Sequence, residues 1–216
     1  MQSVDERYIL DQPSIGDACR SWAYPLDGGR VSQFEYVSVA LALLYSFTVA
    51  RLLTALPSVV APGRRYWIHA AWVAAIILAT LVTWWTVWAL REVSWTALRF
   101  VWILSVPALI HLRAGLLVSE APAAIESWHD HYFQKRIAFF GVGAVQGLNA
   151  LLIPWVMGTV PWFSAAAAHF PAASLLLISA LGLSMKHPLV HGTLVTANLV
   201  MLVLFLAFRG AGAAAV

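Results

Sequence analysis

The sequence predicts an all-α integral membrane protein that crosses the bilayer about six times as helices of one bundle. Hydrophobic residues make up 61% of the 216 residues and charged residues 11%, whereas soluble domains carry roughly 25% charged residues. The mean hydropathy is +0.78. The 11 Trp, 10 Phe and 6 Tyr supply aromatic side chains that settle at the membrane surface. The expected environment is the lipid bilayer, and we expect a bacterial inner membrane.

Long apolar stretches separated by prolines and charged residues define the predicted spans. A helix of about 20 apolar residues crosses a hydrocarbon core of about 30 Å. The spans are predicted at residues 34–56, 67–90, 95–118, 137–160, 164–185 and 189–208. Six spans place both ends of the chain on one side of the membrane.

Turn residues mark the ends of the first three spans. Pro57 and the run at 62–65, Pro-Gly-Arg-Arg, are expected to end the first span, because proline removes a backbone donor. Only residues 91–94 separate the second span from the third, which predicts a tight antiparallel hairpin. Pro107 is expected to kink the third span.

The second half of the chain begins with the longest internal polar segment, residues 119–136. We expect it to form an amphipathic helix on the membrane surface. The fourth span contains Gly141, Gly143 and Gly147, which permit close helix approach and suit an interface between protomers of a homo-oligomer. Prolines and the sequence Lys-His-Pro at 186–188 separate the last three spans.

Residues 1–33 are predicted to form an acidic, turn-rich extramembrane tail without a secretory signal, and residues 209–216 a short C-terminal tail. Positive charges near the span ends predict the orientation. The side of the termini carries Arg20, Arg30, Arg91, Arg99 and Arg209, and the opposite side carries Arg51, Arg64, Arg65, Arg113, Lys135, Arg136 and Lys186. The excess favours the opposite side as cytoplasmic, which places both termini on the non-cytoplasmic side.

Several functional classes are not supported by the sequence. The net charge of +3 arises from residues spread along the ends of the spans and forms no basic patch, so nucleic-acid binding is not expected. We find no phosphate-binding loop, no nucleophile elbow and no HExxH motif. Enzymatic activity is therefore not the favoured interpretation.

Polar and charged residues within the spans are the first set of functional candidates. Because a charge in lipid is costly, these residues should pair, line water or extend to the headgroups. Glu35 and Arg99 are predicted to form an ion pair, whereas Arg51 and Arg113 have side chains long enough to reach the headgroups. The uncharged candidates are Gln146, Asn149 and Asn198, which could line a pathway or join helices by hydrogen bonds.

These candidates support a leading hypothesis. The protein is predicted to be a channel or transporter for an ion or small solute, with polar groups of the first, third, fourth and sixth spans facing a shared interior. Homo-oligomers would supply further room for such a pathway.

Histidines form the second set of candidates, because six of the seven fall on the side opposite the termini. Glu126 and His129 are three residues apart, and His187 and His191 are four apart, which places each pair on one helical face. Imidazole and carboxylate groups bind zinc and iron. A membrane metalloprotein or haem protein is the second hypothesis, with candidate ligands His111, Glu126, His129, His131, His187 and His191.

Two other interpretations stay open at this point. Histidines are tolerated at the membrane surface without any ligand, which would explain their distribution without a metal. The protein could also be a scaffold or sensor that binds a partner protein through the N-terminal tail or the segment 119–136.

Overall fold

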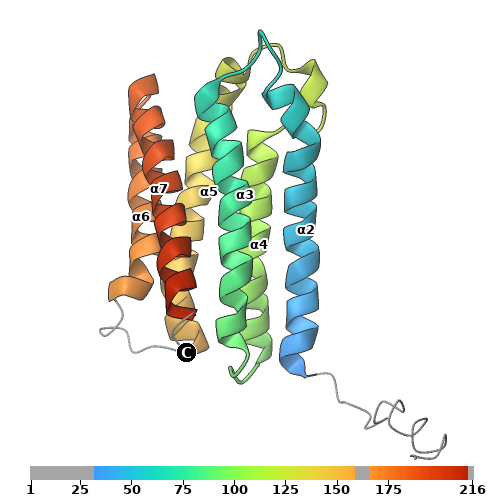
Figure 1. The fold of residues 1–216 in the computed structure, drawn as a ribbon, viewed down its shortest axis with the longest axis vertical. Coiled ribbons are helices and arrows are strands. Elements are labelled where there is room, and N and C mark those ends of the chain that lie inside the picture. The colour runs from blue at the N-terminus through green and yellow to red at the C-terminus, as the bar shows by residue number, and fades with distance from the viewer. Residues whose placement is uncertain (1–31, 159–165, 214–216) are drawn as a thin grey trace, which may run out of the picture. The chain divides into compact units, whose positions relative to one another are not determined.

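A computed structural model describes residues 32–158 and 166–213 of the chain, and within these ranges it contains helices and no strands (Figure 1). The long helices are α2 (Gln33–Val59), α3 (Trp67–Thr86), α4 (Ala97–Leu117), α5 (Trp128–Met157), α6 (Ala166–Ser184) and α7 (Pro188–Ala213). Two short 3-10 helices are η1 (Val87–Leu90), which extends α3, and η2 (Pro122–Ala124). Nearly all of the predicted N-terminal tail and residues 214–216 of the predicted C-terminal tail lie outside the described residues.

The predicted fold class, a polytopic all-α membrane protein, is confirmed. Five helical stretches are long and apolar enough to cross a membrane, namely Gln33–Val59, Trp67–Leu90, Ala97–Ala124, Trp128–Met157 and Pro188–Ala207. The apolar stretch His169–Ser184 of α6 is shorter. It packs against α5 and α7 and so belongs to the same bundle.

The six long helices form a closed circuit in the order α2, α4, α5, α6, α7 and α3, with α3 also contacting α4 and α5. Successive helices run in opposite directions (Figure 1). One end of the bundle therefore carries the loops at 60–66, 118–127 and 185–187, and we call it the histidine end. The opposite end carries the loop at 91–96 and the end of α5, and we call it the cavity end.

Helix α5 begins at Trp128 and not at the predicted Ile137. Ser127 caps it, because its hydroxyl accepts a hydrogen bond from the Asp130 backbone amide at 3.3 Å. Asp130 also places a negative charge in the first turn, which the helix dipole favours. The segment 119–136 is therefore not a separate surface helix. It comprises η2, a loop and the first turns of α5.

The last turn of α2 continues past Pro57 to Val59, although Pro57 was expected to end the first span. Contacts with the loop 118–127 and the start of α5 stabilise this turn. The Ser58 hydroxyl donates to the Pro122 carbonyl at 2.8 Å, and the Trp128 indole N–H donates to the Ser58 carbonyl at 2.9 Å. These hydrogen bonds hold the loop 118–127 against the end of α2.

Gly143 and Gly147 of α5 face α6 of the same chain. A Cβ on Gly147 would lie 2.8 Å from the Leu176 side chain, whereas a Cβ on Gly141 would meet nothing within 4 Å. Gly182 of α6 allows an equally close approach, because a Cβ there would lie 2.5 Å from the Phe140 ring. The small residues at 143 and 147 were expected at an interface between protomers, but their role in the described structure is the α5–α6 contact.

Candidate functional site

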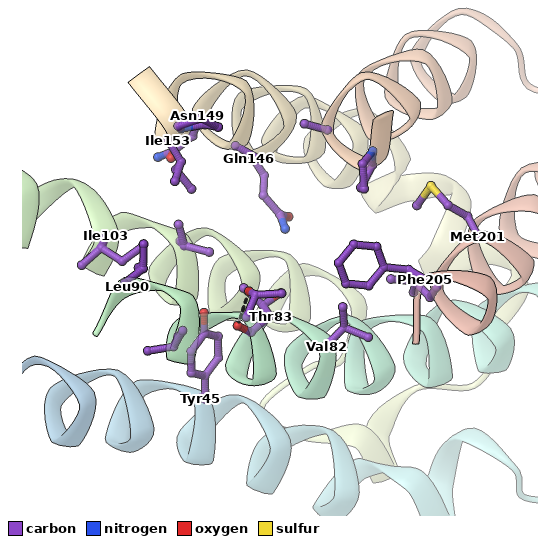
Figure 2. A pocket seen from close by; sticks show the side chains of 18 residues that line it. Tyr45, Val82, Thr83, Leu90, Ile103, Gln146, Asn149, Ile153, Met201 and Phe205 are labelled. Atoms are coloured by element: carbon purple, nitrogen blue, oxygen red, sulfur yellow. Dashed lines mark hydrogen bonds between the residues drawn. The ribbon is translucent and has the colours of Figure 1, made fainter. Parts of the chain in front are cut away.

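A cavity of about 300 Å³ lies inside the bundle toward the cavity end. Every long helix contributes to its wall, through Tyr45 of α2, Thr83 of α3, Ile103 of α4, Gln146 of α5, Ala172 of α6 and Met201 of α7. Figure 2 shows Gln146 extending from α5 toward the centre of the cavity. Most lining side chains are apolar, so the few polar groups determine which solutes the cavity favours.

Asn149 is the polar residue one helical turn from Gln146 on α5. Its amide nitrogen donates to the Ser105 hydroxyl of α4, and this hydroxyl donates in turn to the Trp102 carbonyl at 2.5 Å. The amide oxygen of Asn149 is buried and has no hydrogen-bond partner among the described residues. Gln146 and Asn149 are three residues apart on α5, and both line the cavity.

Arg113 of α4 contacts Gln146 but is not among the described residues that line the cavity. It is buried, with 3% of the residue exposed. Its Nη1 donates to the Gln146 Oε1 at 3.1 Å, so the Gln146 amide nitrogen is left as a donor for the cavity. The guanidinium also stacks over Phe139, with its Cζ 4.4 Å from the ring centroid. Arg113 was expected to reach toward the headgroups. Its side chain instead points into the bundle, where it contacts Gln146 and the face of the Phe139 ring.

The other predicted pathway residues lie elsewhere. Arg51 donates to the Val118 carbonyl at 3.4 Å, and Arg99 donates to the Val156 carbonyl at 3.0 Å and to Ser94 at 2.6 Å. Arg99 thus joins the start of α4 to the end of α5. Asn198 is buried on α7 but is not among the described residues that line the cavity. The Glu35 to Arg99 ion pair stays a prediction.

The predicted histidines are divided among separate environments at the histidine end. His111 approaches the Thr48 hydroxyl at 3.2 Å, His129 binds Asp130 at 2.9 Å, and His187 accepts from the Leu189 backbone amide at 3.3 Å. His131 lies edge-on to His69 and Trp128. Glu126 is exposed. Within residues 32–158 and 166–213, no group of three His, Cys, Asp or Glu side chains is placed to hold a metal ion.

His191 belongs to a buried hydrogen-bond chain that joins three helices. The Trp72 indole donates to the Tyr132 hydroxyl at 3.1 Å, and this hydroxyl lies 2.9 Å from the Nδ1 of His191. The Nε2 of His191 lies 3.0 Å from the Met185 carbonyl. The chain connects α3, α5 and α7 with the end of α6, whereas His187 is exposed and does not belong to it.

Arg136 has a structural role that sequence reasoning missed. Its Nη1 donates to the carbonyls of Gly182, Leu183 and Met185 at 2.7, 2.9 and 2.6 Å. These are terminal carbonyls of α6, and a cation there is favoured by the helix dipole. The sequence treated Arg136 as the end of a polar segment, and no local pattern points to a carbonyl cluster far along the chain.

Comparisons with protein-family models, with curated proteins and with solved structures found no match for this chain.

Proposed function

We propose that this protein moves a small solute across the membrane, with the cavity as the solute-binding part of the pathway. The observation that supports this proposal is an interior cavity bordered by each of the helices α2 to α7, with Gln146 and Asn149 on its wall. A volume of about 300 Å³ falls at the lower end of small-molecule sites.

The pattern of hydrogen bonds favours a pathway over a purely structural role for these amides. Amides that only join helices should have all their polar atoms bonded, because an unpaired buried polar atom costs about 1–3 kcal/mol. Asn149 joins α5 to α4 through one atom, yet its buried oxygen has no partner among the described residues. Gln146 likewise uses its oxygen for Arg113, which leaves a donor for a solute.

Two prolines supply positions at which the wall can bend. Pro154 lies inside α5 and Pro171 inside α6, and both line the cavity. A proline inside a helix removes one backbone hydrogen bond and is a common place for a kink. We infer that α5 and α6 change their bend near the cavity end as the solute enters and leaves.

A pair of phenylalanine substitutions tests the proposal. Ala150 lines the cavity, whereas Leu148 lies two residues earlier on α5 and is 54% exposed on the outer surface. Ala150→Phe should fill much of the cavity and lower solute flux in proteoliposomes at least about tenfold, a change in transition-state free energy of about 1.4 kcal/mol. Leu148→Phe should leave the flux unchanged, because its ring faces lipid.

The flux panel should include neutral, cationic and anionic small solutes at several pH values and membrane potentials. Flux that matches protein-free vesicles for every solute would contradict the proposal. Equal loss of flux in both variants would also contradict it, because the effect would then not depend on the cavity.

A further inference from the structure

Arg113 is a buried cation whose charge is not balanced by any carboxylate in the described part of the chain. The acidic residues described there lie in first helical turns or loops, namely Glu35, Glu92, Glu120, Glu126 and Asp130. Arginine keeps its charge in proteins. Its Nη1 bonds a neutral amide, and its Nε and Nη2 are buried without a hydrogen-bond partner. A buried guanidinium with two free donors is suited to an anion.

A second buried donor faces the same place. The Ser179 hydroxyl of α6 is fully buried and has no hydrogen-bond partner among the described residues. A Cβ on Gly143 would lie 2.7 Å from the Ser179 Oγ and 3.4 Å from both the Nε and the Cζ of Arg113. The two side chains therefore pack against the same point on α5, and a side chain at position 143 would displace the Ser179 hydroxyl.

We propose that Arg113 and Ser179 bind a small anionic group, either a monovalent inorganic anion or the carboxylate of an organic anion. The inference rests on the proposed transport function and names the charge class of its solute. Arg113 supplies the N–H groups of two nitrogens, Nε and Nη2, and Ser179 supplies an O–H donor. Gln146 fixes the guanidinium through Nη1 and so keeps the free edge directed away from itself.

This anion site lies next to the inner end of the cavity. Gln146 connects them, because it lines the cavity and also bonds Arg113. On α6, Ser179 lies two turns beyond the lining residue Ala172, on the same helical face. An organic anion could place its carboxylate at Arg113 and an apolar body in the largely apolar cavity, whereas an inorganic anion would use the Arg113 end alone.

The test is anion-dependent thermal stability of the purified full-length protein in detergent. Chloride, nitrate and a series of carboxylates from acetate to hexanoate replace methanesulfonate, a monovalent anion of neither proposed class, at constant ionic strength, so that general salt effects cancel. A ligand that binds only the folded state raises the unfolding temperature in a saturable manner. Affinity that rises with carboxylate length indicates an organic anion, and preference for chloride or nitrate indicates an inorganic one.

Two variants and two matched controls assign the effect to residues. Ser179→Ala should weaken the apparent affinity at least about fivefold, and Arg113→Gln should abolish the anion dependence. Ser184→Ala removes a hydroxyl of the same helix that bonds the Ala180 carbonyl. Arg51→Gln removes a partly buried arginine on a neighbouring helix. Both controls should keep the wild-type anion response.

If Arg113→Gln does not fold, Ser179→Ala alone decides the assignment. The proposal is overturned if no anion produces a saturable shift in the wild type, or if the shift is unchanged in Ser179→Ala. Flux separates this result from a failure of the proposed function. If no anion binds but a neutral solute is transported and Ala150→Phe blocks its flux, the proposed function stands and only the anion assignment fails. If an anion binds but no solute is transported, the anion site stands and the proposed function fails.

Discussion

The direction of the buried hydrogen-bond chain follows from its last acceptor. A backbone carbonyl only accepts, so the Nε2 of His191 must donate to Met185. The Nδ1 of neutral His191 is then an acceptor, and the Tyr132 hydroxyl must donate to it. Tyr132 in turn accepts from the Trp72 indole. The Tyr132 hydroxyl thus forms hydrogen bonds with ring nitrogens of both Trp72 and His191, and its oxygen joins α3, α5 and α7.

Tyr132→Phe is expected to destabilise the protein by about 1–3 kcal/mol, because it leaves the Trp72 and His191 ring nitrogens buried without partners. The measurement is the free energy of unfolding in mixed micelles titrated with a denaturing detergent. Tyr36→Phe is the control, since Tyr36 is 67% exposed and should change stability by less than about 0.5 kcal/mol. Equal stability of the two variants would show that the hydroxyl is not needed by its neighbours.

At this scale the sequence predicted the inward direction of some side chains and missed that of others. Gln146 and Asn149 were predicted to face inward and do line the cavity. Arg113 was expected to extend to the headgroups, because position along a span does not tell which way a side chain turns. Its inward direction depends on Phe139 and Gln146 of another helix. Ser179 was missed, since a lone serine in an apolar helix carries no signal in sequence.

Among the elements, α5 shows where local patterns were informative and where they were misread. The apolar run predicted a span from Ile137, but the helix begins at the cap formed by Ser127 and Asp130. A serine followed three residues later by an acidic residue is a helix-start signal present in the sequence. Hydropathy alone missed it, because the first turns of α5 are polar. The buried side of these turns became clear only from the contacts of Tyr132 and Arg136.

The α5–α6 contact supplies a prediction for a helix pair. Gly182→Ala should destabilise the bundle by about 1–3 kcal/mol, the usual cost of overpacking, because the new methyl group would overlap the buried Phe140 ring. Gly141→Ala is the matched control on the facing helix, where nothing lies within 4 Å. It should be neutral or stabilising by up to about 1 kcal/mol, since alanine favours helix over glycine.

The same unfolding titration in mixed micelles measures both glycine variants. Equal destabilisation by the two variants would indicate a general intolerance to side chains on these helices and would contradict the assigned packing. Stability above wild type for Gly182→Ala would contradict the close approach itself.

For the whole molecule, composition and apolar run length were sufficient for the fold class. The free energy of an apolar stretch differs so much between water and lipid that helical spans can be predicted without knowledge of their neighbours. The cavity could not be predicted in this way, because it depends on how six helices rotate relative to one another. The six histidines illustrate the same limit. Their shared end of the bundle was apparent in the sequence, but their division among partners such as Thr48, Asp130 and Tyr132 was not.

Substituted-cysteine labelling in lipid vesicles tests the central claim most directly. In a Cys19→Ser background, Gln146→Cys faces the cavity and Val145→Cys lies beside it on α5 with 55% of Val145 exposed on the outer surface. A small charged, membrane-impermeant thiol reagent should modify position 146 from one side of the membrane, while position 145 in lipid stays unmodified. The cavity-filling change Ala150→Phe should slow modification at 146. Equal reactivity at the two positions, or none at 146 from either side, would contradict a solute-accessible cavity.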